Sequence, residues 1–130
     1  MIEKIFAIFI GGGFGAVLRF LVTFLSKKYF MAPIFGTFFV NIIGCFLIGL
    51  VFGFLTYKFQ NISETVKLFI TVGFLGGLTT FSTFNLEIFE LIKAGKVCLS
   101  LAYMVSSCAL GLLFTFFGYL VSNQEFFTAG

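Results

Sequence analysis

Four long apolar stretches dominate this chain, and they decide what it can fold into. They cover residues 5–25, 34–57, 68–86 and 97–121, and Arg19 is the one charge inside the first of them. Each exceeds the roughly 18 residues that a helix rising about 1.5 Å per residue needs to cross a hydrocarbon core. With 60% hydrophobic and only 10% charged residues, the chain has too little polar surface for a water-soluble globule. The sequence therefore predicts an all-α membrane protein with four transmembrane helices.

We expect residues 1–130 to form a single four-helix transmembrane domain, with spans near residues 4–26, 33–58, 64–93 and 96–122. The first stretch is longer than a signal-peptide core and lacks a small-residue cleavage site followed by a polar segment, so we expect a retained helix. Residues 26–32 read as a short polar connection before Pro33, a residue tolerated in the first turn of a helix. Ser63 and Glu64 are a helix start signal. Residues 122–130 are expected to form a short tail.

The third stretch has a centre that resists helix formation. Residues 68–86 carry no charge, yet their middle reads Gly76-Gly77-Leu78-Thr79-Thr80. Glycine costs a helix interior about 1 kcal/mol relative to alanine, and β-branched threonine costs less. We expect the helix to open near residues 75–80, where its freed carbonyls would favour a cation and its freed amides an anion. Alternatively, Gly73 and Gly77 simply let two helices approach closely.

The lysines predict no single orientation in the membrane. An even number of spans places both termini on one side, together with Lys4, Lys58 and Lys67, whereas the opposite connections carry Lys27, Lys28, Lys93 and Lys96. An excess of Lys and Arg in short loops sets orientation, so this near tie predicts insertion both ways up. Two copies could then pair antiparallel and supply an inverted repeat.

Three polar side chains within the spans each have a functional and a structural interpretation. Arg19 either attracts anions in a wet vestibule or extends its guanidinium to the membrane surface. The Asn41 amide either offers a hydrogen to an anion or forms an interhelical hydrogen bond. Glu87 either lines a vestibule or, like Glu90 on the same face, lies at a solvated helix end.

Hydroxyl groups form a stripe on the fourth span. Ser100, Tyr103 and Ser107 share one helical face, so they could continue a polar track begun by Ser82 and Thr83. The same stripe could instead hold two helices together.

Two aromatic residues directly follow the proposed break. Phe81 and Phe84 are two of 23 phenylalanines, and their pattern alone gives them no priority over residues that pack or face lipid. Their positions could nevertheless aim ring edges, which carry partial positive charge, at an anion.

Three motifs together resemble the CrcB/Fluc family of bacterial fluoride channels. They are Gly12-Gly13-Phe14-Gly15-Ala16 with Arg19, Gly36-Thr37-Phe38-Phe39-Val40-Asn41 with Gly44, and Gly76-Gly77-Leu78-Thr79-Thr80-Phe81-Ser82-Thr83-Phe84. The match covers all four spans, and the third motif is the most specific. The resemblance implies an antiparallel, dual-topology homodimer in the bacterial inner membrane. It also implies fluoride resistance through two pores that export fluoride passively.

The resemblance assigns roles to individual residues. Backbone carbonyls of Gly76 and Thr79 from both subunits would hold a central structural sodium ion. The positions that match the fluoride pore are Asn41, Phe81, Phe84, Ser82, Thr83, Tyr103 and Ser107. Arg19 matches a vestibular arginine and Glu87 a vestibular carboxylate.

Other classes of protein fit the sequence less well. A sodium-coupled or multidrug small exporter is the alternative function, although the first two spans lack the intramembrane carboxylate that such antiporters usually need. A non-transporting membrane scaffold would also use small-residue packing motifs. We expect no enzyme and no nucleic-acid partner, because the chain has no His, no Asp and no paired intramembrane carboxylate. Cys45, Cys98 and Cys108 lack the spacing of metal or redox motifs and are expected to be buried free thiols.

Overall fold

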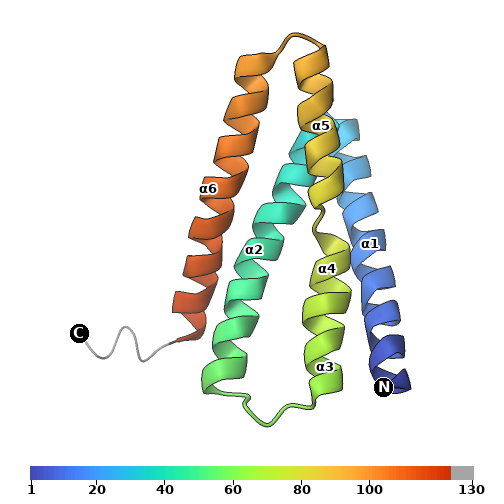
Figure 1. Ribbon diagram of the computed structural model, residues 1–130, viewed down its shortest axis with the longest axis vertical. Coiled ribbons are helices and arrows are strands. Elements are labelled where there is room, and N and C mark those ends of the chain that lie inside the picture. Colours follow the sequence, from blue (N-terminus) through green and yellow to red (C-terminus); the bar gives the residue numbers. More distant parts are fainter. Residues whose placement is uncertain (124–130) are drawn as a thin grey trace, which may run out of the picture.

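The computed structural model describes residues 1–123, and these form helices without any strand (Figure 1). Four helical segments are long and apolar enough to cross a membrane: Ile2–Phe30, Pro33–Tyr57, Glu64–Lys93 and Val97–Ser122. The all-α architecture with four membrane-length helices is thus confirmed, and the chain is a multi-pass membrane protein. Of the predicted tail, Ser122 still belongs to the last helix, and residues 124–130 lie outside the described residues.

The first helix, α1 (Ile2–Phe30), is longer than predicted. The expected polar connection at residues 26–32 is wrong for residues 26–30, which are helical. Lys27 and Lys28 lie in the last turn, where positive charge favours a helix. Ala32 is extended, with φ −143° and ψ 126°, because the ring of Pro33 disfavours helical geometry in the residue before it. The second helix, α2, then runs over Pro33–Tyr57.

The third span is divided into four helical pieces. It begins with α3 (Glu64–Leu68), where the Ser63 side chain accepts a hydrogen bond from the Val66 amide, as a start signal should. A π-helix, η1 (Phe69–Leu75), and the short α4 (Gly76–Leu78) follow. After an interruption, α5 covers Phe81–Lys93. The last helix, α6 (Val97–Ser122), returns antiparallel to α5, so both ends of the described chain lie at the same end of the bundle (Figure 1).

Glycines bring the backbones of α1 and the third span into direct contact. A Cβ atom added to Gly15 would lie 2.1 Å from the Phe74 carbonyl oxygen, and one on Gly77 would lie 2.4 Å from that of Gly12. Gly11 and Gly73 are similarly close to the opposite backbone. Any side chain at these positions would push the helices apart, so the predicted close approach through Gly73 and Gly77 is confirmed.

A second glycine-lined contact joins α2 to α6. A Cβ atom on Gly49 would lie 1.9 Å from the Thr115 carbonyl oxygen, and one on Gly118 would lie 2.0 Å from that of Phe46. The buried apolar centre between α2 and the third span consists of Val40, Leu75 and Leu78. The third span is therefore packed backbone to backbone on α1 and through apolar side chains on α2.

Candidate functional site

The helix of the third span stops at two threonines. Thr79 has φ −86° and ψ 157°, and Thr80 has φ −149° and ψ 124°, so both are extended between α4 and α5. The break predicted near residues 75–80 is present, but it is narrower than expected. Gly76 and Gly77 remain helical, because Gly77 is committed to close packing on α1, and only the threonine pair leaves the helix.

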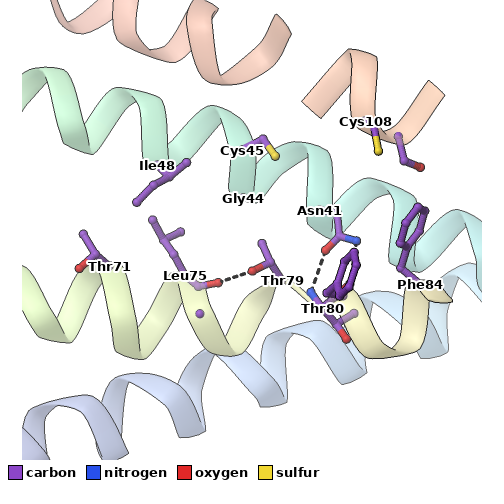
Figure 2. A pocket seen from close by; sticks show the side chains of 13 residues that line it. Asn41, Gly44, Cys45, Ile48, Thr71, Leu75, Thr79, Thr80, Phe84 and Cys108 are labelled. Carbon is purple, nitrogen blue, oxygen red and sulfur yellow. Dashed lines mark hydrogen bonds between the residues drawn. The ribbon is translucent and has the colours of Figure 1, made fainter. Parts of the chain in front are cut away.

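Asn41 of α2 satisfies the backbone that the break exposes. Its Nδ2 donates to the Thr80 carbonyl oxygen at 3.0 Å, and its Oδ1 accepts from the Thr80 amide at 2.8 Å (Figure 2). One carboxamide thus pairs with both polar groups of one peptide residue, which would otherwise cost several kcal/mol in an apolar setting. The interhelical interpretation of Asn41 is correct for these bonds, and one Nδ2 hydrogen remains for another acceptor.

The threonine side chains cap the two helix ends at the break. The Thr79 amide and hydroxyl both donate to the Leu75 carbonyl oxygen, at 3.1 and 2.9 Å. The Thr80 hydroxyl accepts from the Thr83 amide at 3.2 Å, which is an N-cap of α5. Within residues 1–123, no hydrogen bond reaches the carbonyl oxygens of Gly76 or Thr79. The end of α4 therefore presents open carbonyls.

A groove of about 400 Å³ runs along the break (Figure 2). Segments from α2, η1, α4, α5 and α6 line it. The lining contains six of the predicted site residues, namely Asn41, Gly76, Thr79, Phe81, Phe84 and Ser107. The Ser107 hydroxyl oxygen is buried and has no hydrogen-bond partner among the described residues. Among the described residues, the lining thus combines an amide, an unpaired hydroxyl and aromatic rings without any charged side chain.

Phe81 and Phe84 occupy different environments although their ring centroids lie 6.2 Å apart. Phe84 is 6% exposed and meets the Tyr103 ring in a T-shaped contact with centroids 5.0 Å apart. Phe81 is 79% exposed. One ring is therefore fixed inside the chain, and the other projects from it.

Glu87 lies inside the helical bundle, among hydroxyl groups. Its carboxylate accepts a hydrogen bond from the Thr37 hydroxyl at 2.7 Å and from the Tyr103 hydroxyl at 2.8 Å, and the residue is only 8% exposed. The expectation of a solvated helix end is wrong for Glu87, whereas Glu90 is exposed as expected. These contacts join α2, α5 and α6 next to the buried ring of Phe84.

Besides Glu87 and Tyr103, three further predicted site residues lie outside the groove lining. Ser82 and Thr83 are exposed on α5, although the Ser82 hydroxyl lies 3.5 Å from that of Thr80. Arg19 is partly exposed on α1, and the one ion pair among residues 1–123 joins Lys4 to Glu64 instead. Within one chain, the structure therefore does not join these three to Asn41 and the phenylalanines.

The hydroxyl stripe on α6 separates into residues with different partners. Ser100 is buried and donates to the Val97 carbonyl oxygen of its own helix at 2.7 Å. Tyr103 reaches Glu87 instead, and Ser107 alone opens into the groove. A continuous track through all three is therefore not formed by hydrogen bonds within the described chain.

Several site residues were not predicted from the sequence. Thr80 and Thr37 carry the contacts to Asn41 and Glu87, and both lie within the quoted motifs, which was the available signal. Gly44 makes room for Thr79, whose Cγ2 atom would lie 2.1 Å from an added Cβ. Cys45 and Cys108 line the groove. All three cysteines are free, as expected, but none is buried: Cys98 and Cys108 are exposed and Cys45 is partly exposed.

Comparison with known proteins adds a family to this geometry. The model of the family described as "CrcB-like protein, Camphor Resistance (CrcB)" matches residues 6–119. The chain is similar to the protein named fluoride-specific ion channel FluC of Azobacteroides pseudotrichonymphae, with 41% identity over 98% of this chain and 100% of that protein. It is also 41% identical to FluC of Aquifex aeolicus over 92% of this chain and 97% of the relative. FluC of Flavobacterium psychrophilum is 39% identical over 94% and 98%.

Proposed function

The chain belongs to the CrcB family, and on that premise we propose that it is a fluoride-selective ion channel of the bacterial inner membrane. The relatives named above are channels specific for fluoride, and each is covered almost completely by this chain. The protein is accordingly an ion channel and not an enzyme. It exports fluoride passively, down the electrochemical gradient of the ion.

The interrupted third span is the observation that carries this proposal. At the break, Asn41 pairs with Thr80, and the groove beside it collects the donors that a small anion needs. The second Nδ2 hydrogen of Asn41 and the unpaired Ser107 hydroxyl can replace water molecules around fluoride. The ring edges of Phe81 and Phe84 add partial positive charge. Since no charged side chain from residues 1–123 lines the groove, an anion would be bound weakly enough to leave again.

The remaining assigned residues act outside this narrow part. Arg19 raises the local concentration of anions in the vestibule through its positive charge. Glu87 holds Tyr103 and Thr37 at the boundary of the path. Ser82 and Thr83 offer hydroxyls on the exposed side of α5, where a second subunit would cover them. Chloride is excluded because it is larger than the closely set donors allow.

The open carbonyls of Gly76 and Thr79 fit a sodium ion. Hard cations prefer oxygen ligands, and both carbonyls lie at the negative end of the α4 backbone without a hydrogen-bond donor from residues 1–123. Bound there, sodium would neutralise the carbonyl dipoles and act structurally, without being transported. One chain supplies only part of a coordination shell, so the same carbonyls of a second chain would complete it.

The second chain is proposed to be an inverted copy of the first. The near tie of lysines between the two membrane sides supports insertion in both orientations. The exposure of Phe81, at 79% in one chain, leaves a pore ring that an antiparallel partner would cover. Such a dual-topology homodimer would contain two equivalent pores.

A fluoride-electrode assay on protein-containing liposomes tests the function. We expect fluoride to leave the liposomes once the membrane potential that opposes its efflux is dissipated. Chloride should show no comparable efflux, and fluoride efflux should not need a sodium gradient. Absence of fluoride efflux from folded protein would refute the channel. Efflux that stops without a sodium gradient would favour the sodium-coupled exporter instead.

Substitution of the exposed ring tests the aromatic role. Phe81→Ile should abolish fluoride efflux while leaving the fold intact, because the side chain is 79% exposed within the chain. Phe89→Ile is the matched control, since Phe89 lies on the same helix, is 57% exposed and is not part of the groove lining. Undiminished efflux through the Phe81→Ile protein would remove the ring edge from the mechanism.

A further inference from the structure

Two sulfur atoms from different helices face the groove. Cys45 of α2 and Cys108 of α6 are both among its lining residues, and both side chains point into the space between these helices (Figure 2). The third cysteine, Cys98, is a free, exposed thiol on α6 that is not part of the lining. The chain thus carries two thiols at the groove and one elsewhere.

Both groove thiols have room for an added group. Cys108 is exposed and Cys45 is partly exposed. The Cys45 sulfur packs closely against Gly111 of α6, 3.2 Å from the position of a Cβ atom there, so the room beside Cys45 is on the side of the groove that it lines. Ser107, directly before Cys108, buries its unpaired hydroxyl in the same lining. A group attached to either sulfur would therefore project into a space of about 400 Å³ beside the break.

We propose that Cys45 and Cys108 form a thiol-modification site, at which a bulky adduct closes the groove and stops anion flux. This inference rests on the proposed function, since it treats the groove as part of the fluoride path. The modifying species are small, neutral, disulfide-forming electrophiles that can enter from lipid or water. The adduct blocks by filling space, because the attached group displaces water and anion together from the donors at the break.

The covalent step is a thiol exchange with a methanethiosulfonate. The cysteine thiolate attacks the sulfenyl sulfur of the reagent, a new sulfur–sulfur bond forms, and the bond to the sulfonyl sulfur breaks. Methanesulfinate leaves with the electron pair of that bond, and the thiol proton passes to buffer. An added dithiol reductant cleaves the mixed disulfide and regenerates the cysteine.

The test uses benzyl methanethiosulfonate, which is neutral and therefore reaches both sides of a liposome. Fluoride efflux and intact mass are measured on the same full-length protein before treatment, after treatment and after reduction. Two variants separate the sites: Cys98→Ala keeps only the groove thiols, and the double variant Cys45→Ala with Cys108→Ala keeps only Cys98. Each protein is compared with its own untreated sample.

We expect the Cys98→Ala protein to gain adduct mass and lose flux by about tenfold or more, with recovery on reduction. The double variant should gain adduct at Cys98 and keep its own untreated flux. Full modification of both groove thiols without loss of flux, failure of the reagent to modify them, or equal block of the double variant would overturn the proposal. If untreated protein carries no fluoride, the proposed function fails, whereas the mass measurement still reports whether the two thiols react.

Discussion

Against α1 the third span presents bare glycine backbone, whereas against α2 it presents a threonine pair held by an asparagine. On the first side, a Cβ on Gly15 would lie 2.1 Å from the Phe74 carbonyl oxygen, so contact depends on the absence of side chains. On the second side, Asn41 makes two hydrogen bonds to Thr80, so contact depends on a particular side chain. The difference shows how one helix can be packed tightly and still be interrupted: steric fit holds one face while polar pairing stabilises the other.

The largest effect is expected on the glycine side. Gly15→Leu should abolish folding, because the side chain would have to displace the backbone at Phe74 and Leu78. Gly13→Leu on the same helix is the control, since a Cβ there meets no atom of residues 1–123 within 4 Å. Monodispersity in detergent and the midpoint of SDS unfolding measure the outcome. Equal behaviour of the two variants would show that α1 and the third span do not meet through Gly15.

A smaller but still large effect is expected on the polar side. Asn41→Ala leaves the amide and carbonyl of Thr80 unpaired, at about 1–3 kcal/mol for each buried group, so unfolding free energy should fall by about 2–6 kcal/mol. Fluoride flux should be lost with it. Asn85→Ala serves as the control, because the Asn85 side chain is exposed and bonds only to Phe81 of its own helix. Equal SDS unfolding of the two variants would show that the Asn41 hydrogen bonds do not stabilise the contact between α2 and the third span.

A smaller loss of stability is expected when a hydrogen bond to Glu87 is removed. Tyr103→Phe removes one of the two hydroxyl donors to the carboxylate and should reduce stability by about 1–2 kcal/mol. Tyr29→Phe should change nothing, since Tyr29 is 69% exposed at the end of α1. Thermal unfolding in detergent provides the measurement. A stability equal to that of the parent would mean that the Tyr103 hydroxyl does not support the polar side.

The smallest effect is expected within the break itself. Thr79→Val removes the hydroxyl bond to the Leu75 carbonyl oxygen, but the Thr79 amide still donates to the same oxygen. The methyl group that fills the space at Gly44 is also kept. Unfolding free energy should therefore change by less than about 1 kcal/mol. A loss as large as that of Asn41→Ala would show that the hydroxyl, and not the amide, holds the end of α4.

Local chemistry made the four spans and the break predictable, because hydrophobic length and the helix cost of glycine and threonine are properties of neighbouring residues. The prediction placed the glycines and threonines in one break. In the structure Gly77 stays helical and packs against α1, and only Thr79 and Thr80 leave the helix. The burial of Glu87 was not predictable, since its partners Thr37 and Tyr103 come from two other helices. Likewise, only tertiary packing distinguishes buried Phe84 from exposed Phe81.

The π-helix η1 gives the third span room for a surplus residue. Its wide turns hold more residues than α-helical turns do, and the Gly76 amide still reaches back to the carbonyl of Thr71. Deleting one residue from Phe69–Leu75 would let this segment tighten to α-helical pitch without losing its hydrogen bonds. Because π-helical turns are wider, the remaining residues at α-helical pitch would cover nearly the same rotation around the helix axis. Thr80 would then still face Asn41, whereas the same deletion in the α-helical part of the span would turn Thr80 away by about 100°.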